Sequence, residues 1–194
     1  MIVAFLAYIV LVLDNCQKCG IIQIERMMFM ENKFTSPTFG NVDIDKMIGI
    51  MRSFYEKNKH YESPFHVIVG TDSQNFDKTK IVTVCAMQCE SHGGIYFYKV
   101  ERVERIQNVI AKLNYETQLS LDYANKILSR MTEIDEELFD NISFAIHIDA
   151  GHNPKGKTKE LIPSLVGWIN SCGYSCEVKP TSWCASTIAN RISK

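Results

Sequence analysis

Two spacings of apolar residues alternate along most of the chain. Short apolar runs of strand length recur, and several of them end at a turn residue or an aspartate. Longer segments repeat their apolar positions every three to four residues, which is the spacing of an amphipathic helix. The short runs predict strands over 65–71, 81–87, 95–100, 142–148 and 174–179. The helical spacing predicts helices over 43–59, 106–131, 158–173 and 182–192, with Ser182 as the cap of the last one.

The order of these elements from residue 65 onward is β-β-β-α-β-α-β-α, with one additional helix before it. The first three strands are joined by short polar turns, which predicts an antiparallel meander. The fourth strand follows a helical crossover, so it should lie parallel to a strand of the meander, most simply the first. The pattern therefore predicts an α/β protein with a mixed five-stranded sheet. Segment 34–40 carries turn residues without periodicity, and we expect a loop there.

Residues 1–33 do not fit this pattern. The first thirteen residues are apolar and contain no Lys or Arg, but a membrane-spanning helix needs about twenty. The apolar run has no basic segment before it and no small-residue cleavage site after it, so it does not have the features of a signal peptide. Three interpretations stay open: a membrane-proximal anchor, an element that joins the core, or a misassigned start with Met27, Met28 or Met30 as the true one. We favour the last, and divide the chain into a hydrophobic extension, 1–33, and a domain, 34–194.

Composition and charge narrow the possible functions. Of the 194 residues, 46% are hydrophobic and 22% are charged, which is typical of soluble globular proteins and excludes disordered and collagen-like chains. The formal net charge is −1, so a nucleic-acid partner must be held by a local patch or through metal ions. The seven cysteines lie mostly in apolar runs, which predicts reduced thiols and a cytoplasmic protein without stable membrane association. Cys16 and Cys19 have the spacing of half a zinc site, and no second half matches them.

Two aspartates follow predicted strands that we expect to be parallel neighbours. Asp72 comes directly after segment 65–71, and Asp149 directly after 142–148. The carboxyl ends of parallel strands lie at one edge of the sheet, which is where open α/β sheets bind ligands. Two aspartates at one edge repel each other unless a cation lies between them. For either one alone, an ordinary turn residue is the favoured interpretation, but their joint position favours a shared metal ion.

Glu116 is the third candidate acid. It lies on the apolar stripe of the predicted helix 106–131, and the early turns of that helix should begin near Asp72. A buried carboxylate without a partner is costly; the alternative is a glutamate at the rim of the stripe that reaches solvent. Three carboxylates favour Mg²⁺ or Mn²⁺ over zinc. Two such ions about 4 Å apart can activate a water molecule and stabilise the leaving oxygen of a phosphodiester.

Several motifs together resemble a known superfamily. They are Gly70-Thr-Asp-Ser-Gln74, His147-Ile-Asp-Ala-Gly151, Gly156-Lys-Thr-Lys-Glu160, Lys179-Pro-Thr-Ser-Trp-Cys-Ala-Ser186 with Asn190-Arg191, and Ser36-Pro-Thr-Phe-Gly40. In these motifs the chain resembles the ribonuclease H-like superfamily, and more narrowly the YkuK-type family of predicted ribonuclease-H-related proteins, over residues 34–194.

The resemblance implies a ribonuclease H-like fold and metal-dependent cleavage or handling of nucleic acid. It implies that Asp72, Glu116 and Asp149 are the acidic core. The superfamily usually carries a fourth carboxylate on its last helix, and here that place falls on Asn190, whose carbonyl is a weaker ligand. Thr181 stands where an acidic or polar residue is expected. Substrate contacts are expected from a further set of residues: Ser73, Gln74, Lys157 and Lys179.

A rival motif lies after the fourth predicted strand. Residues Gly151–Thr158 match G-x4-GK[ST], the phosphate-binding loop of many NTPases. Pro154 removes a backbone N–H that such a loop uses, and no downstream strand ends in an aspartate that would hold Mg²⁺. We therefore favour contacts of Lys155, Lys157 and Lys159 with a nucleic-acid backbone; a solvated basic turn is the alternative.

Two histidines and a row of aromatic residues complete the candidates. His147 shares a strand face with Asp149 and is expected to be a packed core residue. His152 lies in the loop, where it is a candidate proton shuttle. Residues Tyr96–Tyr98 alternate across a predicted strand; sheet packing explains them, and base stacking is the alternative.

Three functions therefore remain from the sequence. The first is a nuclease that hydrolyses phosphodiester bonds of RNA, DNA or a hybrid with two Mg²⁺ or Mn²⁺ ions. The second is a nucleic-acid-binding module of the same fold without catalysis. The third is a nucleotide binder that uses the motif at Gly151–Thr158.

Overall fold

The computed structural model describes residues 33–150 and 159–194. Several predictions concern segments outside these residues: the translation start, the Cys16–Cys19 pair, and the G-x4-GK[ST] motif with His152, Lys155 and Lys157. They stay predictions, as does the domain boundary at residue 33.

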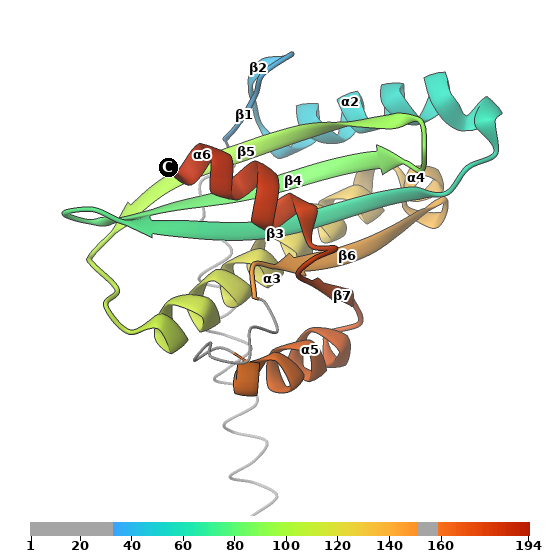
Figure 1. The fold of residues 1–194 in the computed structure, drawn as a ribbon. Helices are drawn as coiled ribbons and strands as arrows, with labels where there is room; N and C mark the ends of the chain where they lie inside the picture. The colour runs from blue at the N-terminus through green and yellow to red at the C-terminus, as the bar shows by residue number, and fades with distance from the viewer. Residues whose placement is uncertain (1–32, 151–158) are drawn as a thin grey trace, which may run out of the picture. The chain divides into compact units, whose positions relative to one another are not determined.

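A mixed sheet of seven strands forms the centre of the fold (Figure 1). Its strands are β1 (Phe34–Ser36), β2 (Gly40–Val42), β3 (Phe65–Asn75), β4 (Thr79–Cys89), β5 (Gly93–Val103), β6 (Ile142–Ile148) and β7 (Ser175–Val178). Their order across the sheet is β2-β1-β5-β4-β3-β6-β7. Strands β3, β4 and β5 form the antiparallel meander, and β6 lies parallel to β3. The predicted α/β class, meander and parallel neighbour are thus confirmed.

The sheet has two strands more than the five predicted. The segment expected to be a loop forms a hairpin in which Phe34 pairs with Val42, and Thr35 pairs with Tyr98 of β5. Phe34 and Val42 are both buried. Gly40 adopts a φ of +68° at the turn, a backbone conformation that glycine accepts without strain. Each strand spans only three residues, which is too short for an alternating pattern to be visible in the sequence.

The predicted helices are present in the predicted order with different ends, and one further helix, α4 (Glu136–Asp140), was not predicted. They are α2 (Ile44–Asn58), α3 (Val109–Ile134), α4 (Glu136–Asp140), α5 (Ile162–Ser171) and α6 (Asn190–Ser193), with 3₁₀ turns η1 (Lys59–Tyr61) and η2 (Lys159–Leu161) and a π-helical segment η3 (Cys184–Ala189). The predicted final helix is therefore a π-helical segment followed by a short α-helix. Ser182 does not cap it: its hydroxyl is buried and has no hydrogen-bond partner among the described residues. No helix in the described part of the chain is both long and apolar enough to cross a bilayer.

Alternate residues of β3 face different helices. Odd-numbered positions face α2 and α3: Phe65 packs edge-on against Tyr55 of α2, with ring centroids 4.9 Å apart. Even-numbered positions face the C-terminal segment, where Ile68 packs in a cluster with Cys184. Figure 1 shows this segment, in red, crossing β3 and β4. The sheet is therefore covered by helices on both faces, and α3 and α6 approach it from opposite sides.

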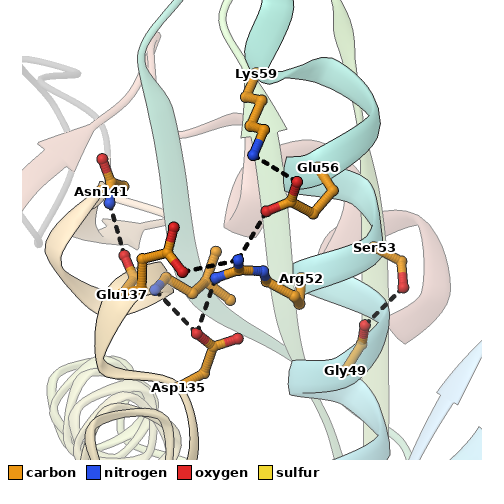
Figure 2. A network of polar contacts seen from close by, with 9 residues as sticks. Gly49, Arg52, Ser53, Glu56, Lys59, Asp135, Glu137 and Asn141 are labelled. Atoms are coloured by element: carbon orange, nitrogen blue, oxygen red, sulfur yellow. Dashed lines mark hydrogen bonds and ion pairs between the residues drawn. The ribbon is translucent and has the colours of Figure 1, made fainter.

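An ion-pair network joins α2 to the residues before β6 (Figure 2). The guanidinium of Arg52 donates to Asp135 at 3.1 Å and to Glu137 at 2.9 Å, and it also pairs with Glu56 at 2.8 Å. Hydrogen bonding to Glu137 and the neighbouring carboxylates raise the pKa of Arg52. The network lies near the amino end of β6, so it stabilises the scaffold at the end of this strand opposite to the predicted acidic edge.

Candidate active site

Asp72 and Asp149 directly follow the last paired residues of two adjacent parallel strands. The parallel pairing of β3 with β6 ends at Thr71 and Ile148, so the two aspartates are the next residues along adjacent strands. Strand β3 does not end at Asp72, as the sequence suggested, because its pairing with β4 continues to Asn75. The register therefore brings the two predicted acids to one edge.

Asp72 is held under the last helix. Only 6% of its surface is exposed, and its Oδ2 accepts a hydrogen bond from the hydroxyl of Ser193 at 2.7 Å. Burial raises the pKa of Asp72, and the charge of Asp149 raises it further. The Ser193 hydrogen bond and the charge of Lys112 oppose this rise. A carboxylate in this position is therefore stabilised by added positive charge.

Glu116 approaches from the opposite face of the sheet. It lies on α3 with 5% of its surface exposed, so the alternative of a solvent-reaching rim residue is wrong. Its Oε1 accepts a hydrogen bond from the hydroxyl of Ser73 at 2.5 Å. Burial raises the pKa of Glu116 to about 8, against the Ser73 hydrogen bond, and the charges of Asp72 and Asp149 raise it further. The three acids thus act on one another electrostatically.

Lys112 was not anticipated from the sequence. Its ammonium donates to the backbone carbonyl of Ser73 at 3.0 Å, and its charge lowers the pKa of both Asp72 and Glu116. The available signal was its position four residues before Glu116, since residues at this spacing share a helix face.

Asp149 has a lysine as its partner. The Nζ of Lys179 forms a close ion pair with Asp149 Oδ1, and the backbone N–H of Lys179 donates to the carbonyl of Ala150 at 3.0 Å. Lys179 follows β7, the strand parallel to β6. The structure thus brings this predicted substrate-binding residue to the acidic edge.

The last helix contacts the site through a residue other than the one expected. The side-chain amide of Asn190 donates to the carbonyl of Ser186 at 3.2 Å, within its own helical segment. The contact with Asp72 comes from Ser193, three residues later, which is fully buried. Gln74 is half-buried and lies opposite Lys80 of β4. The roles of Asn190 as a ligand and Gln74 as a substrate contact stay predictions.

Buried hydroxyl groups fix α3 against β3. The hydroxyl of Ser120 lies 2.8 Å from Thr71 Oγ1 and 2.9 Å from the carbonyl of Glu116. Thr71 in turn lies 3.1 Å from Thr83 Oγ1 on β4. All three hydroxyl residues are buried. These contacts set the position of the helix turn that carries Glu116.

The donor chemistry suits a hard divalent cation. Asp72, Glu116 and Asp149 offer carboxyl oxygens, which as carboxylates are the ligands that Mg²⁺ and Mn²⁺ prefer. Burial raises the pKa of Asp72 and of Glu116, and a bound cation would favour their ionised forms. In the described ranges, no three His, Cys, Asp or Glu side chains are gathered closely enough to hold a metal ion. Each acid has its own partner instead: Ser193, Ser73 or Lys179.

His147 is a core residue, as expected. It is 2% exposed, accepts a hydrogen bond from the backbone N–H of Cys184 at 3.2 Å, and packs edge-on against Trp183. Burial lowers its pKa to about 4, so it is neutral at physiological pH. Sheet packing also accounts for Phe97, which is fully buried.

Comparison with known proteins agrees with the motifs. A family model described as "Ribonuclease H-like" matches residues 46–194. The "Uncharacterized protein YkuK" of Bacillus subtilis (strain 168) is 31% identical, over 74% of this chain and 87% of that protein. The match to a solved structure titled "Structure of Mos1 transposase catalytic domain and Raltegravir with Mg" covers 69% of this chain and 58% of that chain, at 10% identity and a TM-score of 0.28. From the family match and the YkuK relative, the chain belongs to the ribonuclease H-like family.

Proposed function

We propose that the protein is a nuclease that hydrolyses phosphodiester bonds of nucleic acid with Mg²⁺ or Mn²⁺ bound by Asp72, Glu116 and Asp149. The observation that carries this proposal is the burial of Asp72 and Glu116 at the edge where Asp149 leaves the sheet. Membership of the ribonuclease H-like family supports it.

A structural role alone does not explain these acids. Burying a carboxylate costs several kcal/mol in desolvation unless charge and hydrogen bonds compensate it. Gln or Asn would make the hydrogen bonds to Ser73 and Ser193 without a buried charge. The charge of Asp149 raises the pKa of Asp72, and the charges of both aspartates raise the pKa of Glu116, so their proximity adds to this cost. A divalent cation would offset both the desolvation cost and the repulsion between the acids.

Each residue around the acids has a defined task in this proposal. Ser73 orients Glu116, and Ser193 orients Asp72. The ammonium of Lys179, beside Asp149, is suited to hold a substrate phosphate. When bound, a pair of divalent ions supplies activation of a water molecule and stabilisation of the leaving oxygen. Asn190 as a further ligand, and Gln74 and Lys157 as substrate contacts, belong to the same proposal.

A cleavage assay with matched variants tests the proposal. Labelled RNA, DNA and hybrid substrates are incubated with Mg²⁺ or Mn²⁺ and the wild type, Asp72→Asn or Asp149→Asn. Loss of a metal ligand removes several kcal/mol of transition-state stabilisation, so we expect cleavage about 100-fold slower or worse. Asp140→Asn, an exposed aspartate on α4, is the control and should cleave normally. Cleavage without divalent metal, or at full rate in the Asp72 and Asp149 variants, would refute the proposal.

A non-catalytic binding module is the second candidate. It is favoured by the last helix, which presents the hydroxyl of Ser193 to Asp72 and not a carboxylate, and by the separate partners of the three acids. Tight binding of nucleic acid by the wild type, with no cleavage under any metal, would select this candidate. A nucleotide binder is the third, and it predicts ATP binding that Lys157→Ala abolishes and Asp72→Asn leaves intact.

A further inference from the structure

A hollow lined with positive charge lies at the tip of the β3–β4 hairpin. Its volume is 530 Å³, and its lining residues are Phe76, Asp77, Lys78, Lys80 and Arg102. Three of these five side chains are cationic and one is anionic, in a chain whose formal net charge is −1. The positive charge is therefore a local feature of this end of the sheet and does not follow from composition.

The hollow adjoins the acidic site on one face of the sheet. Lys80 lies opposite Gln74 on β3 and opposite Arg102 on β5, so these three residues form a row across three strands. Gln74 lies two residues after Asp72, and two residues of a strand span about 7 Å and restore the same face. The row therefore lies on the same face of the sheet as Asp72, one strand repeat further along β3, and Ser193 of the last helix covers Asp72 on this face.

The last helix connects the hollow to Asp72. The ammonium of Lys80 donates to the carbonyl of Ile192 at 2.6 Å, and the next residue, Ser193, donates to Asp72. This contact fixes the position of Lys80, whose ammonium has three donors, so two remain for a ligand. Lys78 also pairs with Glu104 at 3.2 Å. We therefore assign the strongest anion contacts to Lys80 and Arg102.

Phe76 is an exposed aromatic residue beside these cations. It is 53% exposed, and its backbone N–H donates to the carbonyl of Lys78 at 2.9 Å, which closes the turn that carries the ring. An aromatic ring in this position contributes little to the core of its own fold. Aromatic rings beside Lys and Arg bind single-stranded nucleic acid by stacking on unpaired bases, which a duplex does not offer.

We infer that this hollow binds a single-stranded segment of nucleic acid and leads it to the acidic site, with phosphates on Lys80 and Arg102 and a base on Phe76. The inference rests on the proposed function, because it takes nucleic acid as the substrate. It goes further by naming the strand state that the protein selects and the surface that selects it.

Binding without cleavage tests the inference. Fluorescence anisotropy with a short labelled single strand is measured in EDTA for the wild type, Arg102→Glu, Arg102→Gln and Phe76→Ala. We expect Arg102→Glu to weaken binding about tenfold and to reduce its salt dependence, because a phosphate contact is lost. Arg102→Gln should act in the same direction. Phe76→Ala should weaken binding of the single strand about tenfold and leave binding of a duplex unchanged.

Lys46→Glu is the control for charge reversal. Lys46 is exposed in the first turn of α2, which covers the other face of the sheet, so this variant should bind as the wild type does. Wild-type binding that the Arg102 and Phe76 variants leave unchanged, or preference for a duplex, would overturn the inference and leave the proposed nuclease intact. A wild type that binds no single strand in EDTA would also overturn the inference, and it would leave the proposed nuclease intact, because that enzyme can hold its substrate through its metal ions.

Discussion

The pKa of Glu116 reflects both its burial and the charges of the neighbouring acids. Its pKa near 8 means that, without a cation, the carboxyl is largely protonated at neutral pH. In that state it can keep its contact with Ser73. A bound divalent cation favours the ionised form, so metal affinity should fall as the pH is lowered.

The same pKa predicts how stability depends on pH. In metal-free protein, the folded state keeps a proton on Glu116 up to about pH 8, whereas the unfolded chain releases it near its ordinary value of 4.5. The free energy of unfolding should therefore fall as the pH rises between these values. We expect Glu116→Gln to reduce this fall by more than about 1 kcal/mol. Urea unfolding in EDTA at several pH values measures this pH dependence, with the exposed Glu90→Gln as control. An equal pH dependence in the wild type and Glu116→Gln would contradict the raised pKa of Glu116.

Lys179 should compete with a cation for Asp149. The ammonium and a divalent ion carry like charge near the same carboxylate. Because Lys179 is 45% exposed, solvent screens the pair to about 1 kcal/mol or less. Lys179→Met should therefore lower the Mn²⁺ concentration at half-maximal thermal stabilisation by up to about fivefold. The exposed Lys57→Met is the control. A higher Mn²⁺ midpoint in Lys179→Met would show that the lysine assists the metal.

At the scale of elements, the contact of η3 with β3 depends on a residue without a side chain. A Cβ at Gly70 would lie 2.8 Å from the backbone nitrogen of Ala185 and 3.1 Å from the carbonyl of His147. Backbone atoms cannot give way as a flexible side chain would. Gly70 therefore allows the C-terminal segment to lie close enough for Ser193 to reach Asp72.

Gly70→Ala should destabilise the protein by about 1–3 kcal/mol through this overpacking. Gly167→Ala is the matched control, because a Cβ there meets no atom within 4 Å and alanine is the better helix former in α5. We expect that control to be neutral or slightly stabilising. Thermal and urea unfolding measure both variants. Equal stability of the two would contradict the close approach of η3 to the sheet.

The sequence predicts the elements that carry long periodic patterns. Strands β3 to β6 and helices α2 and α3 were all expected, because their apolar spacing extends over many residues. The sequence places the end of β3 too early, because Ser73 and Gln74 are polar and the pairing with β4 that extends β3 past them leaves no mark in the pattern. The three-residue strands β1 and β2 and the π-helical η3 have no periodic signal of their own.

At the scale of the molecule, the site is assembled from four distant segments: β3, α3, the residue after β6, and the last helix. Topology rules predict the convergence of Asp72 and Asp149, because parallel strands end at one edge. They do not predict which side chain of α6 reaches Asp72, or that Lys112 and Lys179 supply the nearby positive charge. Those contacts depend on helix rotation and rotamers, which spacing along the chain does not fix.

Isothermal titration calorimetry with Mn²⁺ tests the central claim that these acids hold a common cation. The wild type should bind Mn²⁺ saturably, and Asp72→Asn and Glu116→Gln should each weaken the affinity about tenfold or more, since each removes a charged ligand. Asp140→Asn should bind as the wild type does. Saturable binding that persists unchanged in both site variants, or a wild type that binds no Mn²⁺, would contradict a shared metal site at this edge of the sheet.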